Sequence, residues 1–329
     1  MTTDTALRWL GGVPLFDPSQ GSTVIASPGQ GPGWWVGAPS ALYDRESGPT
    51  YLYYRVRKPR ALGRGGECRI AASRDGLNFE TVWSAKKDAF GSPSIERGCL
   101  VKTPEGRWRL YLSFVDPADD RWRIDLLEAD TPEALDPGER RKILTAADIG
   151  GEGVKDPVVY LLGGLYWMVV SYAPGRPDAT AAEKAQMHAT ADVYNTGIVK
   201  SHTGLALSPD GVHFRWEGDL LSPPDTGWDR YCTRISTLLY TPPVWTALYD
   251  GSGSVEENYE ERAGVAVSLD GCHFERLTLN GPALTSPHAS GSVRYVEALR
   301  LDTEIRYYYE FALPDGSHEL RCSRVPLSG

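Results

Sequence analysis

The chain has 329 residues and a formal net charge of −9, with 41% hydrophobic and 23% charged residues. This balance is typical of a globular protein and excludes a disordered chain, while the negative charge disfavours a nucleic-acid partner because phosphates would be repelled. We see no basic run that would offset this charge. Aromatic residues make up 10% of the chain, with 17 Tyr and 10 Trp, which favours strands over helices.

The remaining composition gives no sign of a metal, a disulfide framework or a membrane segment. The start, MTTDTALRWLGG, lacks the pattern of a secretion signal, and no apolar run reaches membrane-spanning length, so we expect a cytoplasmic protein. We expect no cofactor and no metal, because the histidines do not form a ligand pattern. The cysteines are odd in number and scattered, at Cys68, Cys99, Cys232, Cys272 and Cys322.

A strand, an Asp-Gly turn and a strand opened by an aromatic residue recur along the chain. Three copies are clear, at 70–79, 205–214 and 265–274, and two degenerate copies lie at 124–130 and 320–325. The copies begin 54 to 60 residues apart, except for one interval of 81 residues. One blade of a β-propeller has about this length. We assign Asp75, Asp210 and Asp270 to hairpin turns rather than to catalysis.

Each copy follows two further runs with strand patterns, so each repeat predicts four strands. In chain order these pairs are 38–43 with 51–55, 96–101 with 108–113, 156–161 with 166–171, 234–239 with 245–250, and 295–299 with 305–310. The sequence therefore predicts an all-β fold, a five-bladed β-propeller of four-stranded antiparallel blades in one domain spanning 1–329. An insertion at about 174–202 in the third blade contains the one helix-like stretch, 179–191. Leu7–Phe16 is expected to supply the outer strand that closes the last blade.

Loops entering the innermost strands of a propeller surround its axis, where ligands bind. The inner strands align Ala38, Glu96, Asp156, Arg234 and Tyr295 at one level. Aromatic rings that stack on sugars, together with charged groups that hold hydroxyls, are expected around this level. The predicted binding residues are Trp34, Trp35, Arg97, Trp228, Tyr231, Arg234, His288, Arg294 and Glu297.

The repeats and the segment Val154–Val158, which reads VKDPV, resemble the five-bladed glycoside hydrolases of families 43, 32, 62, 68 and, more distantly, 130. The resemblance implies an Asp base in the first blade, an Asp that modulates pKa and a Glu acid. Asp156 matches the modulating Asp. The base falls on Ala38, and the acid falls near Tyr231–Arg234, where there is no Glu, so two of the three roles are unfilled.

Other carboxylates offer a replacement pair. We predict Glu96 as the acid/base and Asp156 as its partner, since glycoside hydrolysis needs two carboxyl groups. The alternative is that Glu96–Arg97 and Asp156–Arg234 are buried ion pairs between blades. Asp229 could replace a missing carboxylate or cap its loop.

The insertion could fold over the mouth and contribute His188 or Asp192, or remain an exposed loop.

The predicted function is cleavage of a glycosidic bond in the central pocket by carboxylate chemistry, on a small-molecule or oligosaccharide substrate. Two alternatives remain open. One is a carbohydrate-binding propeller without catalysis. The other is a lyase or isomerase acting on an acidic sugar, suggested by Arg97, Arg234 and Arg294, with Tyr231 or His288 as the base. The sequence does not determine the oligomeric state.

Overall fold

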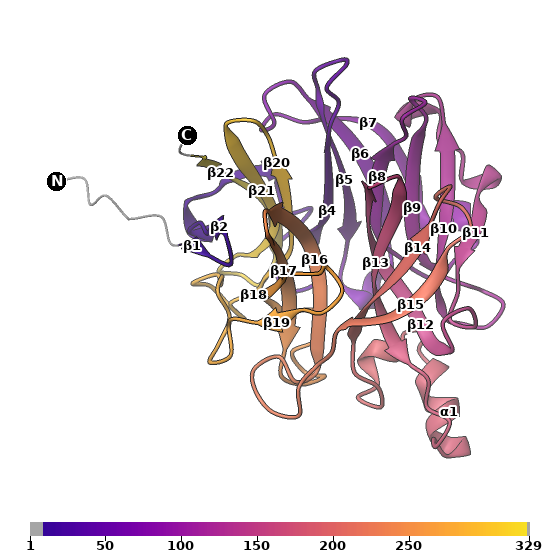
Figure 1. Ribbon diagram of the computed structural model, residues 1–329. Coiled ribbons are helices and arrows are strands. Elements are labelled where there is room, and N and C mark those ends of the chain that lie inside the picture. Colours follow the sequence, from indigo (N-terminus) through magenta and orange to yellow (C-terminus); the bar gives the residue numbers. More distant parts are fainter. Residues whose placement is uncertain (1–8, 328–329) are drawn as a thin grey trace.

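The computed structural model describes residues 9–327, and antiparallel strands dominate them (Figure 1). The strands pair in chain order into four-stranded antiparallel units. The first unit contains β4 (Trp35–Tyr43), β5 (Thr50–Arg57), β6 (Glu67–Ser73) and β7 (Glu80–Lys86). The second contains β8 (Ile95–Lys102), β9 (Trp108–Val115), β10 (Trp122–Ala129) and β11 (Arg141–Leu144). The predicted strands of these two repeats are confirmed.

The next two units follow the same order. The third contains β12 (Gly151–Leu162), β13 (Leu165–Pro174), β14 (His202–Ser208) and β15 (Arg215–Leu221). The fourth contains β16 (Cys232–Thr241), β17 (Val244–Ser252), β18 (Arg262–Ser268) and the short β19 (Glu275–Arg276). These mostly β, four-stranded antiparallel sheets are consistent with a β-propeller.

The last unit joins the two ends of the chain. It contains β20 (Val293–Arg300), β21 (Glu304–Ala312) and β22 (His318–Pro326), and β22 pairs antiparallel with β3 (Ser22–Ile25). The strand beside β22 is therefore β3 and not the predicted stretch Leu7–Phe16.

That stretch folds back on itself instead, because Gly11 and Gly12 both have positive φ and turn β1 (Trp9–Leu10) onto β2 (Val13–Pro14). Leu7 and Arg8 lie outside the described residues.

The Asp-Gly repeats are turns, as predicted. The carboxylate oxygen Oδ1 of Asp75 accepts hydrogen bonds from the backbone N–H groups of Leu77 and Asn78, both at 2.8 Å. Asp210 and Asp270 make the same two bonds in their own repeats. Backbone hydrogen bonds hold the pKa of Asp75 and Asp210 below the usual range, and at Asp270 the His273 side chain, followed by the backbone bonds, does the same.

Each innermost strand is interrupted at the same place by an irregularity in its pairing with the second strand. In three of the five strands a non-glycine residue there has a left-handed backbone: Ala38 (φ 53°), Asp156 (φ 56°) and Tyr295 (φ 52°). Such conformations are costly for residues with a side chain and persist where the surrounding structure enforces them. The bulges point side chains of consecutive residues toward the centre.

The insertion is ordered and contains a helix, as predicted. Helix α1 (Ala181–His188) begins with a capping box between Thr180 and Glu183 and projects at one end of the molecule (Figure 1). A short 3₁₀ turn, Val193–Asn195, follows it. Met187 and Tyr194 of the insertion are buried with Trp122 in one hydrophobic cluster. Within residues 9–327, no helix has both the length and the apolar character needed to cross a membrane.

Candidate functional site

The ring of Tyr295 occupies the centre of the inner strands. Four guanidinium groups, supplied by β5, β8, β16 and β20, lie 4.0 to 5.9 Å from its centroid: those of Arg55, Arg97, Arg234 and Arg294. The Tyr295 backbone N–H donates to Asp250 at 2.8 Å, which fixes the left-handed residue that carries the ring. Cations over an aromatic face are attracted to it, so the ring organises a layer of buried charge.

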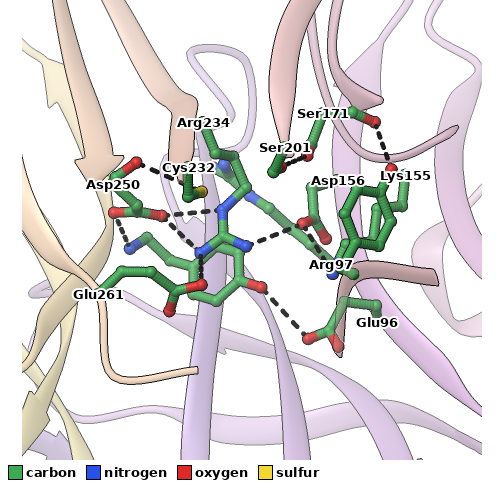
Figure 2. Close-up of polar contacts among 12 residues, drawn as sticks. Glu96, Arg97, Lys155, Asp156, Ser171, Ser201, Cys232, Arg234, Asp250 and Glu261 are labelled. Atoms are coloured by element: carbon green, nitrogen blue, oxygen red, sulfur yellow. Dashed lines mark hydrogen bonds and ion pairs between the residues drawn. The ribbon is translucent and has the colours of Figure 1, made fainter. Parts of the chain in front are cut away.

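Arg234 forms the densest part of this layer (Figure 2). Its Nη2 lies 2.9 Å from Asp250 and 3.3 Å from Glu261, and its Nη1 lies 3.4 Å from Asp156. All four side chains are buried. The Asp156–Arg234 ion pair between units is thus present, as one alternative in the sequence predicted. Lys155 Nζ, 3.5 Å from Asp156, adds a second cation.

Glu96 does not pair with Arg97, the ion-pair partner considered from the sequence. Its carboxylate forms ion pairs with Arg55 and Arg57 of β5, and the structure records no pair with its neighbour Arg97 among residues 9–327. Glu96 and Arg97 both lie in the irregular part of β8 and both approach Tyr295, but their charged ends have different partners. Burial alone would disfavour the charged form, but the cations of Arg55 and Arg57, then Lys155, hold the pKa of Glu96 well below its usual range. Glu96 is therefore a carboxylate at neutral pH.

Arg97 turns toward Glu297 instead. Its Nη2 donates to Glu297 Oε2 at 2.6 Å, and both side chains are buried. Burial raises the pKa of Glu297 to about 7, with Arg97 opposing that rise. Tyr160 and Cys99 are near enough to feel the Glu297 charge. Neither Arg97 nor Glu297 is among the residues that line the pocket described next.

We predict that Glu297→Gln removes a pH dependence of folding. A carboxyl group whose pKa rises on folding stabilises the folded protein below its unfolded pKa, and this stabilisation is lost as pH rises through about 7. The wild type should therefore lose about 2–3 kcal/mol relative to Glu297→Gln between pH 4.5 and pH 8. Urea unfolding at several pH values measures the difference, and a difference that does not change with pH contradicts the assignment.

A pocket of about 60 Å³ lies beside the central layer. Glu96 and Arg294 contribute to its lining from the inner strands, and Trp35 contributes a ring. Trp35 also stacks on His318, with ring centroids 5.0 Å apart, and lies 5.1 Å from the Arg294 guanidinium. The other lining residues are Gly33, Arg55, Arg57, Lys58, Arg60, Arg64, Asp192 and Tyr259.

The insertion supplies the second carboxylate of this pocket, Asp192. It accepts hydrogen bonds from Trp122 Nε1 at 3.1 Å and from the Tyr259 hydroxyl, and it lies 3.4 Å from Arg64 Nη2. Ala191 and Tyr259 have left-handed backbones, with φ of 51° and 78°. The insertion therefore reaches the pocket lining through Asp192.

His188, the other residue proposed from the insertion, hydrogen bonds Glu152 at 3.0 Å and is not part of this lining.

Several predicted binding residues have structural contacts away from this lining. Trp34 lines a neighbouring pocket that shares Arg57, Lys58 and Arg64 with the first. Trp228 stacks on Tyr249 at 5.8 Å and donates to the Thr278 carbonyl. His288 packs edge-on against Phe311.

Two further predicted residues act as anchors. The Tyr231 hydroxyl donates to the Tyr194 carbonyl at 2.8 Å and so ties the insertion to β16. Asp229 is fully buried, where Arg276 Nη1 lies 2.8 and 3.0 Å from its two oxygens and the Tyr249 hydroxyl donates to it at 2.7 Å. These partners are side chains of β17 and β19 rather than backbone N–H groups of its own loop, so Asp229 holds its loop through an ion pair and a hydrogen bond.

Five lining residues come from one segment that was not predicted to belong to the site. Residues 55–64 read RVRKPRALGR and contain five basic and no acidic residues. The expectation that no basic run offsets the net charge was therefore wrong for this segment. Its charge density was visible in the sequence, but its position beside Glu96 follows from the pairing of β5 with β4 and the contact between the first two units.

No protein-family model and no curated protein sequence matches the chain. Solved structures do match it over nearly its whole length. A levansucrase from Bacillus subtilis, solved in complex with oligosaccharides, is 11% identical, covers 97% of this chain and 89% of its own, and has a TM-score of 0.65. A β-1,2-mannobiose phosphorylase from Listeria innocua is 16% identical, with coverages of 95% and 92% and a TM-score of 0.60. A thermostable family-43 glycoside hydrolase is 13% identical, with coverages of 94% and 93% and a TM-score of 0.60.

At these identities the likeness concerns the fold. The chain shares the fold of these three enzymes, and its four-stranded antiparallel sheets are consistent with a β-propeller.

Proposed function

We propose that the chain is a carbohydrate-active enzyme that cleaves a glycosidic bond in the pocket lined by Glu96 and Asp192. The four-stranded units then form a closed five-bladed propeller in which β3 completes the last blade. The observation that carries the proposal is the placement of Glu96, a buried carboxylate that lines a pocket in a fold shared with enzymes named as a glycoside hydrolase and a phosphorylase.

Glu96 is suited to act as nucleophile or base. Two guanidinium groups keep it charged, which is the form needed to attack the anomeric carbon or to activate water. It is correspondingly unsuited to the role of proton donor. Asp192, the other carboxylate of the lining, pairs with one guanidinium, that of Arg64, rather than with two, and we assign it the role of proton donor, with the Tyr259 hydroxyl orienting one of its oxygens.

Asp156 takes a positioning role in this proposal. It is fully buried and does not belong to the pocket lining, so substrate would not touch it. It pairs with Arg234, whose guanidinium lies 4.0 Å from the Tyr295 ring centroid. The Tyr295 hydroxyl reaches Glu96 Oε1 at 3.5 Å. Asp156 therefore acts on Glu96 through Arg234 and Tyr295.

A second candidate is a sugar-binding protein without catalysis. It is favoured by the ion pairs that occupy Glu96 and by a pocket volume of about 60 Å³, which holds about two water molecules. A sugar ring enters such a pocket only when the long side chains around it move. The lyase or isomerase alternative is less well supported, because Tyr231 is committed to the Tyr194 carbonyl and His288 packs on Phe311.

Hydrolysis of a panel of neutral and acidic chromogenic glycosides tests the proposal, with Glu96→Gln, Asp192→Asn and Asp156→Asn as variants. We expect activity in the wild type, a large loss for Glu96→Gln and Asp192→Asn, and a smaller loss per folded molecule for Asp156→Asn. Saturable sugar binding without turnover supports the second candidate. Turnover that survives Glu96→Gln removes Glu96 from the mechanism.

A further inference from the structure

The lining of the pocket is strongly cationic in an acidic protein. Six of its eleven residues are Arg or Lys, and two are carboxylates. The whole chain, in contrast, carries a formal net charge of −9. Like charges that cluster in a partly buried site repel one another unless opposite charges, from the protein or from a bound ligand, balance them.

The carboxylates of the protein do not balance all of these cations. Glu96 pairs with Arg55 and Arg57, and Asp192 pairs with Arg64. Arg294 is balanced by Glu261 and Glu310. Lys58 and Arg60 are exposed at the pocket and form no ion pair with any residue in 9–327. The mutual repulsion is visible at Arg64, whose pKa is lowered mainly by burial and further by Arg57 and Arg60.

One of the lining residues also carries a buried donor without a partner. Arg55 is only 2% exposed, and its Nη1 has no hydrogen-bond acceptor among the described residues. Its other contacts, to Glu96 and at 3.3 Å to Glu310, leave this N–H group free. A buried guanidinium N–H without an acceptor is costly, and a ligand oxygen would satisfy it.

We propose that the pocket binds the carboxylate of an acidic sugar residue. Lys58 and Arg60 attract the anion, the long side chains around the pocket move to admit it, Arg55 Nη1 donates to a carboxylate oxygen, and Trp35 lines the same pocket. A guanidinium presents parallel N–H groups that match a carboxylate, which favours this planar anion. The inference rests on the proposed function, which supplies the class of ligand, a sugar. It adds that this sugar carries a negative charge.

Calorimetric titration of the full chain with matched pairs of sugars tests this binding without requiring turnover. Methyl glucuronide, galacturonide and mannuronide are compared with methyl glucoside, galactoside and mannoside, at low and high salt, and inorganic phosphate is titrated separately. In at least one pair we expect the uronide to bind about tenfold more tightly than its neutral partner, with the difference shrinking as salt increases.

The double variant Lys58→Gln/Arg60→Gln should bind the preferred uronide about tenfold more weakly and lose the discrimination. Lys142→Gln, which removes an exposed lysine of β11, is the matched control and should bind as the wild type does. Both variants remove side chains without ion partners among residues 9–327, so the fold should be retained.

Equal affinities within all three pairs, or unchanged discrimination in the double variant, would overturn the inference. Phosphate that binds more tightly than every uronide would overturn it in favour of a free oxyanion. These results are independent of catalysis. Uronide preference without any hydrolysis contradicts the proposed function alone, and hydrolysis of neutral glycosides without uronide preference contradicts this inference alone.

Discussion

We expect Glu96→Gln to lower the proposed glycoside hydrolysis by about 10²–10⁴-fold, the usual range for losing a catalytic carboxyl group. Gln keeps the shape of the side chain but removes the charge that would serve as nucleophile or base. The Arg55 and Arg57 guanidiniums then face a neutral amide, so some stability is lost as well. The measurement is kcat on the best substrate of the glycoside panel, normalised to the folded fraction from circular dichroism.

Asp156→Asn is the matched control for this variant. It also neutralises a buried, ion-paired carboxylate of an inner strand, but one outside the pocket lining. We expect its kcat per folded molecule to fall by no more than about tenfold, since in our proposal Asp156 acts through Arg234 and Tyr295 rather than on substrate. If the two variants lose activity equally, Glu96 has no special role at the pocket and both losses reflect disruption of the charged layer.

Arg234→Met costs about 3–5 kcal/mol of unfolding free energy at pH 7. Met fills much of the volume of Arg, so the loss comes from charge rather than from a cavity. Three buried carboxylates, Asp156, Asp250 and Glu261, lose the guanidinium that they share. The charged form of Asp250 is already disfavoured, because burial raises the pKa of this carboxyl group even with Arg234 present.

Urea unfolding at pH 7 and pH 5 measures this cost. It should shrink at pH 5, because protonation relieves carboxylates that have lost their cation. Arg215→Met, on the exposed face of β15, is the control and should change stability by no more than about 0.5 kcal/mol. A loss for Arg234→Met that does not exceed this control would show that the central ion pairs contribute nothing to stability.

Local patterns in the sequence determined the strands and turns. The Asp-Gly motifs predicted hairpin turns because an Asp side chain satisfies the next backbone N–H groups wherever the motif occurs. Runs of alternating apolar residues predicted the inner strands, and the capping pattern around Thr180 accompanied the predicted helix. The likeness to glycoside hydrolases of the propeller type was also visible before the structure, and the comparisons with solved structures support it.

The tertiary structure decided which charges meet. The sequence offered Arg97 as the partner of Glu96, but in the folded chain Arg97 pairs with Glu297, and Glu96 pairs with Arg55 and Arg57 from β5. It also decided that β3, rather than the stretch before it, pairs with β22, since two glycines turn the preceding segment into its own hairpin.

The residues of a site are those whose side chains lie within about 3 Å of one another, although they are far apart in the chain. A local sequence pattern does not contain this information. The basic segment 55–64 therefore joined Glu96 at the pocket only when the chain was folded, and the structure selected Asp192 over His188 from the insertion.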